Sequence, residues 1–308
     1  MAIDSVFQSW RPGTRKQYSS AWTRWHMWCN LRMCNSIKPL ESDIILYLLY
    51  LKQLKKSYSV ISCHKSVILE TVKILNPNIV LNFNILNRFM KGLNREIPPK
   101  PRYVFTWDVG KVLNVIAKWM PLQSLSLKLL TFKLVSLVAL CTAARAQSLK
   151  ALNINHLCIK EDVAIFDCGD LLKTTKPGQN FVIKLCSYEE QELCPVLTLK
   201  YYLKCTQSLR KDSQLFVSFK NYKAVSSSTL ARWLKNVLLL AGIDIVKYKA
   251  HSYRGASSSA ASRAGCKMSE ILKTANWSSA ENFKVFYLRD VQNDHIESNY
   301  QNCVLNSR

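Results

Sequence analysis

The sequence lacks the segments and the composition that mark several classes of protein. Only 8 glycines and 9 prolines occur in 308 residues, which excludes collagen-like and low-complexity chains. The opening segment MAIDSVFQSWRPGTRKQ has no apolar core and is not expected to be a signal peptide. The longest apolar run, residues 124–141, is interrupted by Lys128 and Lys133, so it predicts a buried helix and no membrane partner.

Cysteine patterns and common nucleotide or metal motifs are missing as well. The 11 cysteines include no C-x-x-C pair, and neither Cys29/Cys34 nor His26/Cys29 has a second half at zinc-finger spacing. Reduced thiols are therefore expected. The sequence contains no G-x-x-x-x-G-K-[ST], G-x-G-x-x-G or H-E-x-x-H motif and no carboxylate cluster of a two-metal nuclease. We expect no cofactor.

Acidic residues are scarce relative to basic ones. The chain has 43 Lys and Arg against 20 Asp and Glu, a formal net charge of +23. Residues 1–100 hold 15 basic and 5 acidic residues, so the excess is spread over both halves. Such a chain repels itself unless an anion is near. Nucleic acid, an anionic membrane surface and an acidic protein are the candidate partners; the membrane is the weakest of them, and any partner would touch both halves.

Three prolines in the segment EIPPKPR (96–102) predict an extended stretch that divides the chain. We place an N-terminal helical domain at 1–97, a linker at 98–104 and a second domain at 105–308. In the first domain, Thr14 is expected to cap a helix whose aromatic residues Tyr18, Trp22 and Trp25 recur at helical spacing and favour core packing. Three further helices are expected at 42–54, 60–75 and 84–93.

The second domain combines helices with a small antiparallel sheet. Short β-type runs separated by turn residues predict three strands, with a turn at Lys176–Gln179 between the second and the third. The expected strands are 156–159, 163–167 and 181–185. The expected helices are 106–119, 125–141, 193–207, 227–241, 255–264, 268–274 and 280–288. The predicted fold class is therefore mainly α with a small antiparallel β-sheet.

One set of residue types in the second domain suits a reaction at a phosphodiester. It consists of an arginine after the long apolar helix, a hairpin lysine, an H-x-x-R motif, a tryptophan and a tyrosine ten residues later. In chain order these are Arg145, Lys173 or Lys176, His251, Arg254, Trp277 and Tyr287. One helical turn would place His251 and Arg254 side by side.

In this order and spacing the residues resemble the tyrosine recombinase (phage-integrase-like) family, and most closely the recombinases of DIRS-like, Ngaro and Crypton mobile elements. The resemblance runs from residue 9 to residue 290. It rests on the segments SWRPGTRKQY, PPKPRYVFTWDVGKVL, LKLLTFKLVSLVALCTAARAQSLKAL, LLKTTKPG, AHSYRGASSSAA and ILKTANWSSAENFKVFY. It implies a four-helix, SAM-like core-binding domain and a C-terminal catalytic domain that clamp double-stranded DNA. It also implies a tetramer on two duplexes and a nuclear location.

The resemblance gives each residue of the set a role at the scissile phosphate. Arg145 and Arg254 would bind the nonbridging oxygens, for which the planar guanidinium fork is well suited. Lys173, preferred over Lys176, would protonate the departing 5′ oxygen. Ser148 stands where the family often has Glu or Asp, so the usual support of Arg145 is missing.

The remaining three residues would act on the attacking group. Tyr287 would be the nucleophile, and His251 would take its proton or orient the phosphate. Trp277 stands where the family uses His or Trp; its indole N–H is a donor and its body is an apolar wall. A phosphotyrosine keeps the energy of the broken bond, so rejoining would need neither ATP nor metal.

The sequence therefore predicts a site-specific recombinase or integrase of a mobile element. Arg15, Lys16, Arg24 and Lys176 are predicted DNA contacts, because basic side chains neutralise phosphates. Two alternatives stay open from the sequence: a catalytically silent DNA-binding protein, and an enzyme like type IB topoisomerases.

Overall fold

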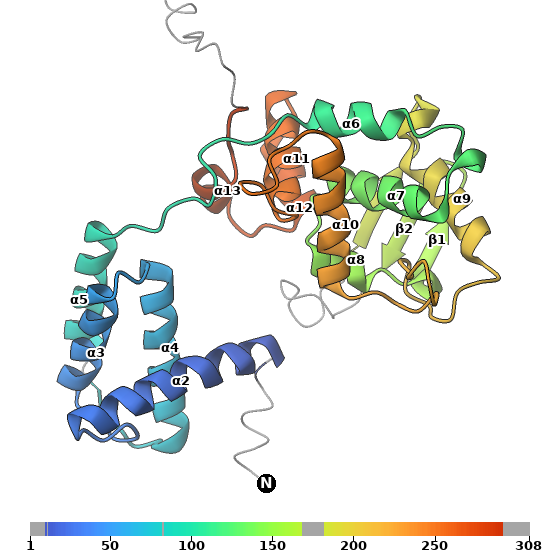
Figure 1. The fold of residues 1–308 in the computed structure, drawn as a ribbon. Coiled ribbons are helices and arrows are strands. Elements are labelled where there is room, and N and C mark those ends of the chain that lie inside the picture. Colours follow the sequence, from blue (N-terminus) through green and yellow to red (C-terminus); the bar gives the residue numbers. More distant parts are fainter. Residues whose placement is uncertain (1–9, 11, 82, 168–181, 292–308) are drawn as a thin grey trace, which may run out of the picture. The chain divides into compact units, whose positions relative to one another are not determined.

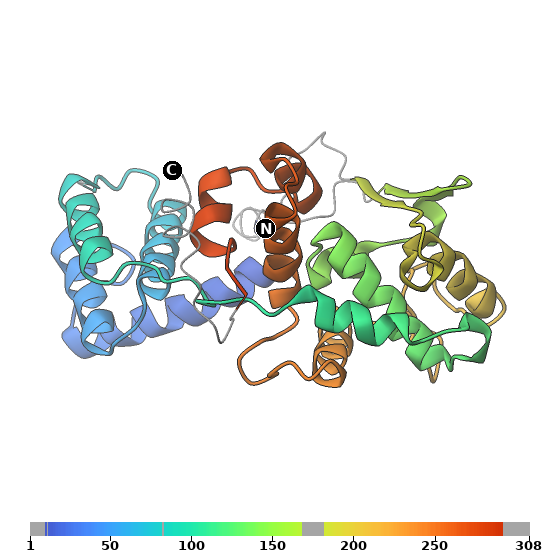
Figure 2. The same cartoon turned by 90° about the horizontal axis from the view of Figure 1, so that it is seen from above.

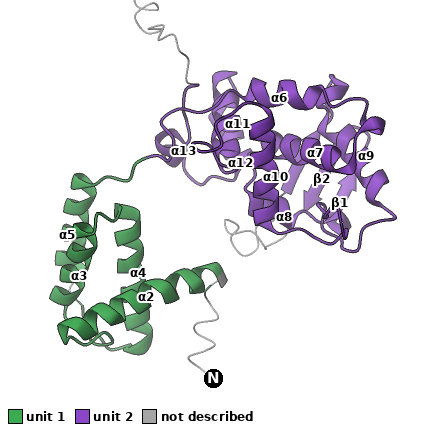
Figure 3. Ribbon diagram, viewed as in Figure 1, with its two compact units in different colours: residues 1–100 green, residues 101–308 purple. Residues whose placement is uncertain are grey.

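The structure, a computed structural model, describes residues 10, 12–81, 83–167 and 182–291 (Figure 1). The chain divides into two compact units, residues 1–100 and 101–308 (Figure 3). The division falls inside the predicted linker at 98–104. Each unit has a hydrophobic core of its own.

Unit 1 contains four helices in the part of the chain that is described. They are α2 (Pro12–Arg32), α3 (Glu41–Gln53), α4 (Tyr58–Leu75) and α5 (Phe83–Glu96). Trp25, Cys29 and Leu48 are fully buried where α2, α3 and α4 pack together. The predicted aromatic core is therefore confirmed at Trp25, whereas Tyr18 is half-buried.

The start of α2 differs from the prediction. The helix already includes Pro12 and Gly13, two residues before the predicted cap Thr14. A proline fits the first turn of a helix because its missing N–H would have no intrahelical acceptor there. The other three helices of unit 1 lie within a few residues of their predicted ranges.

Unit 2 is built around the long apolar helix α7 (Leu127–Thr142). Ser126 caps it by accepting a hydrogen bond from Leu129 N. Residues 130–139 are buried, because α7 packs against α9, α10, α11 and strand β3. The other helices are α6 (Val109–Ala117), α8 (Ala146–Ala151), α9 (Pro195–Thr206), α10 (Ser227–Leu240), α11 (Ser252–Arg263), α12 (Met268–Ala275) and α13 (Ala280–Phe286).

Lys133 of α7 is buried, and no salt bridge joins it to a carboxylate among the described residues, although the charge of Glu192 acts on it. Its ammonium group donates to the carbonyl oxygens of Ile116 (2.9 Å) and Trp119 (2.8 Å), which end helix α6. Burial lowers the pKa of Lys133 to about 8. Lys133, one of the two lysines that interrupt the apolar run, thus joins α7 to the end of α6.

A three-stranded antiparallel sheet lies at the opposite end of unit 2 from α12 and α13 (Figures 1 and 2). Its strands are β1 (Leu157–Ile159), β2 (Val163–Asp167) and β3 (Val182–Cys186), in the order β1-β2-β3. Ala164, Phe166, Ile183 and Leu185 alternate toward the core. The predicted fold class, mainly α with a small antiparallel sheet, is confirmed. The predicted turn at Lys176–Gln179 lies outside the described residues.

Candidate active site

The first predicted arginine lies at the turn between α7 and α8. Ala143, directly after α7, adopts the left-handed conformation (φ 48°, ψ 28°), and the chain then re-enters a helix at Ala146. Arg145 is the N-cap residue of this short helix and is half-buried. Its guanidinium has no hydrogen bond or ion pair with any other described residue. Ser148 is buried in α8 and supplies no carboxylate to Arg145.

The H-x-x-R motif lies at the start of α11. The helix begins at Ser252, three residues before its predicted start, so His251 is the N-cap residue and Arg254 is in the first turn. Arg254 is only 2% exposed. Its Nη1 donates to Ala143 O (2.7 Å) and its Nη2 to Ala275 O (2.6 Å). Arg254 therefore ties α11 to the ends of α7 and α12.

These two bonds leave donors of Arg254 unused. A guanidinium has five N–H groups, and the buried Nε of Arg254 has no partner within the described chain. A buried donor without a partner is unfavourable, so such a group either serves a ligand or stores strain.

Tyr287 follows α13 directly. The helix, capped by Ser279, ends at Phe286, so Tyr287 lies just outside the helix that was predicted to run to residue 288. Its backbone angles are φ −125° and ψ −32°, and its side chain is half-buried. The phenol oxygen lies 3.4 Å from Nε2 of His251, a long hydrogen bond. The H-x-x-R motif, with His251 and Arg254, thus shares one site with Tyr287.

Trp277 forms the wall of this site. Its ring lies 4.8 Å from the ring of Tyr287 and 5.0 Å from that of Phe283, measured between centroids. The guanidinium carbon of Arg254 lies 4.1 Å from the centroid of Trp277, a close cation–π contact. The tryptophan therefore holds both the arginine and the tyrosine by packing.

The charges around His251 keep its imidazole neutral. Burial lowers the pKa of His251 below its ordinary value of 6.5, and the positive charges of Arg254, Arg102 and Arg145 lower it further. Burial, together with the charge of Arg145, lowers the pKa of Arg254 to about 10, so that group stays charged at neutral pH. No carboxylate contributes to either shift. The site combines a neutral base with uncompensated positive charge.

The structure also brings a residue to the site that the motifs did not reveal. Arg102 lies in the predicted linker and in the segment PPKPRYVFTWDVGKVL of the resemblance, where it was given no role, yet its charge affects the pKa of His251. Lys173 and Lys176 lie outside the described residues, so the leaving-group role of Lys173 stays a prediction. Arg15, Lys16 and Arg24 are exposed on α2 of unit 1.

Solved structures with the same fold are known. No protein-family model matches the chain, and no curated protein matches its sequence. A lambda integrase (75–356) dimer bound to a COC′ core site is similar with a TM-score of 0.58 and 13% identity, over 96% of each chain. The XerH site-specific recombinase bound to difH after cleavage has a TM-score of 0.58 and 16% identity, over 80% of this chain and 68% of that one. The chain has the fold of the lambda-integrase-like tyrosine recombinases.

A third similar structure is the Tn1549 transposon integrase with circular intermediate DNA, at a TM-score of 0.57 and 13% identity over 88% of this chain and 86% of that one. At such identity the likeness is one of fold. The recombinase fold is thus established by the backbone, whereas the roles of the residues in the site rest on their geometry.

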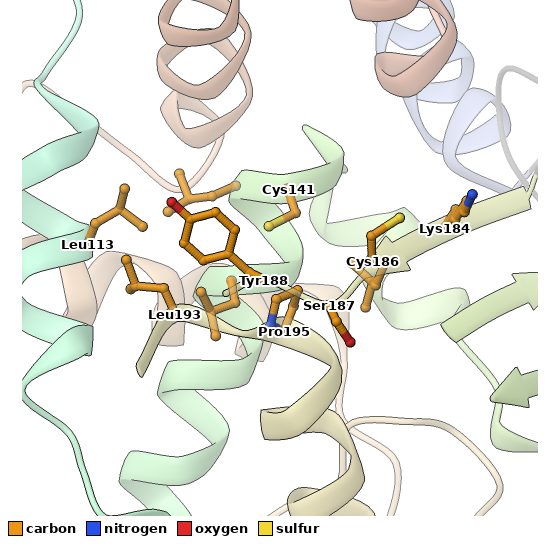
Figure 4. Close-up of a pocket in the computed structure, with 11 residues that line it drawn as sticks. Leu113, Cys141, Lys184, Cys186, Ser187, Tyr188, Leu193 and Pro195 are labelled. Atoms are coloured by element: carbon orange, nitrogen blue, oxygen red, sulfur yellow. The ribbon is translucent and has the colours of Figure 1, made fainter. Parts of the chain in front are cut away.

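An apolar cavity elsewhere in unit 2 is separate from this site. It has a volume of about 410 Å³ and lies where the end of α7, strand β3 and the start of α9 meet (Figure 4). Leu113, Cys141 and Tyr188 are among its lining residues, which include none of the predicted catalytic residues. The described residues also contain no group of three or more metal-ligating side chains and no helix long and apolar enough to cross a membrane.

Proposed function

We propose that this protein is a site-specific DNA recombinase that breaks and rejoins strands through a 3′-phosphotyrosine on Tyr287. The observation that carries the proposal is the phenol oxygen of Tyr287 placed 3.4 Å from a neutral His251, beside the guanidinium of Arg254. A neutral imidazole can accept the phenolic proton, and arginines can neutralise the phosphate that is attacked. Nucleophile, base and electrophilic partner are thus present together.

The proposed cleavage step is a displacement at phosphorus. His251 Nε2 takes the proton of Tyr287, the phenol oxygen bonds to phosphorus, and the bond from phosphorus to the 5′ oxygen breaks. The 5′ oxygen takes up a proton, for which Lys173 is the proposed donor. Arg145 and Arg254 stabilise the charge that builds up on the nonbridging oxygens. Attack by a 5′ hydroxyl reverses the step and rejoins the strands, so the cycle needs neither ATP nor metal.

Double-stranded DNA is the proposed partner of both units. The formal net charge of +23 favours a polyanion, and the exposed Arg15, Lys16 and Arg24 of α2 offer phosphate contacts from unit 1. We propose that residues 1–97 form a core-binding domain and residues 105–308 the catalytic domain. A lambda integrase tetramer bound to a Holliday junction is similar in fold (TM-score 0.59, 12% identity, 96% of this chain and 78% of that one). By this likeness, the proposed assembly is a tetramer on two duplexes.

The proposed biological setting comes from the sequence resemblance alone. The segments AHSYRGASSSAA and ILKTANWSSAENFKVFY resemble the recombinases of DIRS-like, Ngaro and Crypton elements. We therefore propose that the protein acts on mobile-element DNA in the nucleus.

A trapping experiment tests the proposal. The protein is incubated in EDTA with a pool of 5′-labelled duplexes of randomised sequence, nicked so that the short 5′-hydroxyl fragment diffuses away after cleavage. We expect a covalent protein–DNA band on a denaturing gel for the wild type and for Tyr47→Phe, a matched tyrosine variant in unit 1. Tyr287→Phe should bind duplex and give no band.

Other results of this experiment would favour other functions. Salt-sensitive duplex binding without any covalent band contradicts the proposal and supports a silent DNA-binding protein. A band accompanied by relaxation of a supercoiled plasmid that lacks paired sites supports an activity like that of type IB topoisomerases. A band that persists in Tyr287→Phe shows that another residue is the nucleophile.

A further inference from the structure

We infer that Ser259 is a positioning residue that sets the place of Tyr287 relative to His251 and Arg254; this inference rests on the proposed function. Ser259 lies on α11, the helix whose start carries both of those residues. It is fully buried. None of the motifs in the sequence marks it.

The hydroxyl of Ser259 bridges the carbonyl group of Tyr287 and the backbone amide of Arg289, two residues downstream. Ser259 Oγ donates to the carbonyl oxygen of Tyr287 (2.9 Å) and accepts from the amide of Arg289 (3.0 Å). A serine hydroxyl has one donor and two acceptor positions, so one side chain satisfies both groups. Among the described residues, Ser259 is the side chain of α11 that contacts the carbonyl group of Tyr287 itself, whereas Arg263 at the end of α11 donates through its Nη1 to Arg289 O (2.9 Å).

The two neighbouring serines of α11 behave differently. The hydroxyls of Ser257 and Ser258 lie 3.4 Å and 2.6 Å from Arg254 O, in their own helix. This is the ordinary local bond of a helical serine and links no other segment. Ser257 is therefore a matched control for Ser259, because it has the same side chain on the same helix without the bridge.

The chain around Tyr287 is also fixed from its two ends. On the upstream side, Tyr287 N donates to Phe283 O (2.9 Å), which continues the pattern of α13. On the downstream side, Arg289 Nε donates to Tyr103 O (2.9 Å) and Thr106 N donates to Asp290 O (2.9 Å). These anchors locate the segment in unit 2, whereas Ser259 and Arg263 join it to α11, the helix whose start carries the base.

The bridge therefore helps to set how Tyr287 faces His251, together with the packing of Trp277 on the phenol ring. Gly255, one turn before Ser259, lies next to the same carbonyl group: a Cβ built there would be 3.7 Å from Tyr287 O, an ordinary contact. Without the Ser259 hydroxyl, a carbonyl and an amide would lose their partner, and the segment would shift to find new ones. A shift of about 1 Å in a reacting group can slow a reaction about 100-fold.

Single-turnover cleavage of the nicked duplex, with protein in excess, tests this inference. We expect Ser259→Ala to slow formation of the covalent band about 10- to 100-fold while the Kd for duplex stays as in the wild type. Ser259→Thr, which restores the hydroxyl, should recover most of the rate, and Ser257→Ala should cleave like the wild type. Thermal unfolding of each variant is measured beside the rate.

A chemical change in the substrate separates positioning of the nucleophile from help to the leaving group. When sulfur replaces the scissile 5′ oxygen, the leaving thiolate needs no proton. The defect of Ser259→Ala should persist on this substrate, because attack by Tyr287 is what is impaired. A Lys173→Ala variant should recover on it if Lys173 is the proton donor.

Several results would overturn the inference. It fails if Ser259→Ala cleaves at the wild-type rate, if sulfur substitution rescues it, or if its loss of rate is matched by an equal loss in Ser257→Ala. Should Ser259→Ala not fold, Ser259→Cys keeps the side-chain volume with a weaker donor and should cleave at an intermediate rate; a wild-type rate would contradict the inference. Absence of any band from the wild type would instead refute the proposed function.

Discussion

Tyrosine and histidine are hydrogen-bonded to each other in both units of this chain, with opposite surroundings. In unit 1, Tyr47 Oη lies 2.9 Å from His64 Nδ1, and in unit 2, Tyr287 Oη lies 3.4 Å from His251 Nε2. Burial lowers the pKa of both histidines. By chemical type the two pairs are equal, so any difference in what they do must come from their neighbours.

The pair in unit 1 is part of the core. Tyr47 is 1% exposed and His64 is 4% exposed. Tyr47 lies against the rings of Trp25 (5.1 Å) and Trp28 (5.4 Å), and burial raises its pKa. A substrate phosphate cannot reach a phenol that is covered in this way, and the phenolate is disfavoured. The bond between Tyr47 and His64 satisfies two polar groups and nothing more.

The pair in unit 2 is half-buried and surrounded by arginines. Arg254 stacks on Trp277 beside Tyr287, and Arg145 has no partner among the described residues. A tyrosine–histidine pair thus becomes a candidate site through access to the pair and through several arginines around it, whereas the pair in unit 1 is covered and feels the charge of Arg24.

Removing the arginines should have the largest effect and should distinguish the two of them. We expect Arg145→Ala to lower the single-turnover cleavage rate about 10²- to 10³-fold without a change in the unfolding midpoint, because its guanidinium holds no other part of the protein. Arg254→Ala should lower the rate at least as much and also destabilise the fold, since Ala143 O and Ala275 O each lose a charged donor. Urea unfolding beside the cleavage assay measures both effects. Equal destabilisation by the two variants would show that Arg145 is structural too.

A fall in pH should affect both pairs. It should slow cleavage through His251 and lower the free energy of unfolding through His64. Below pH 6.5, as the pH falls through the lowered pKa of His251, the base becomes protonated and cleavage should slow by about tenfold per pH unit. His251→Ala should be slow and should lose this acid limb. A pH–rate profile at saturating DNA, compared with that of His64→Leu, makes the measurement. An unchanged acid limb in His251→Ala would rule out His251 as the base.

The direction in which the free energy of unfolding changes with pH follows from the lowered pKa of His64. The unfolded chain binds protons at His64 from pH 6.5 downward, whereas the folded chain binds them only at lower pH. The free energy of unfolding is therefore greatest above pH 6.5 and falls as the pH drops below it. His64→Leu should weaken this dependence while leaving the acid limb of the rate in place.

The smallest expected effect is the loss of one hydroxyl from each pair. Tyr47→Phe leaves His64 Nδ1 without a partner in the core and should lower the free energy of unfolding by about 1–3 kcal/mol. Tyr287→Phe removes a long bond at a half-buried position and should change stability by less than about 0.5 kcal/mol. Urea unfolding of the two variants gives both values. A greater loss of stability in Tyr287→Phe would reverse the assignment of the two pairs.

Much of the fold could be predicted because apolar periodicity reports it directly. The four helices of unit 1 and the strands β2 and β3 show a clear period of burial, and α7 stands out as a continuous apolar run. The six-residue helix α8 is too short to show one, and α11 begins with polar residues, so its start at Ser252 was placed late.

The residue types of the candidate site could be predicted from the sequence. The hydrogen bonds that hold these residues in place could not. The order of residue types along the sequence predicted five site residues that the structure describes, and all of them lie in unit 2: Arg145, His251, Arg254, Trp277 and Tyr287. The carbonyl partners of Arg254 and the bridge from Ser259 join segments far apart in the chain, and such bonds leave no pattern in a sequence. The sequence predicted Tyr287 inside a helix, whereas α13 ends at Phe286. No proline or glycine marks this helix end in the sequence, because the end depends on those tertiary hydrogen bonds.

Direct identification of the residue joined to DNA is the measurement that tests the central claim most closely. The trapped complex is digested with nuclease and trypsin, and the peptides are sequenced by mass spectrometry. We predict a nucleotide linked through its 3′ phosphate to the phenol of Tyr287, on the tryptic peptide Val285–Arg289. A nucleotide on any other residue, or a trapped complex whose Val285–Arg289 peptide is wholly unmodified, would contradict the account.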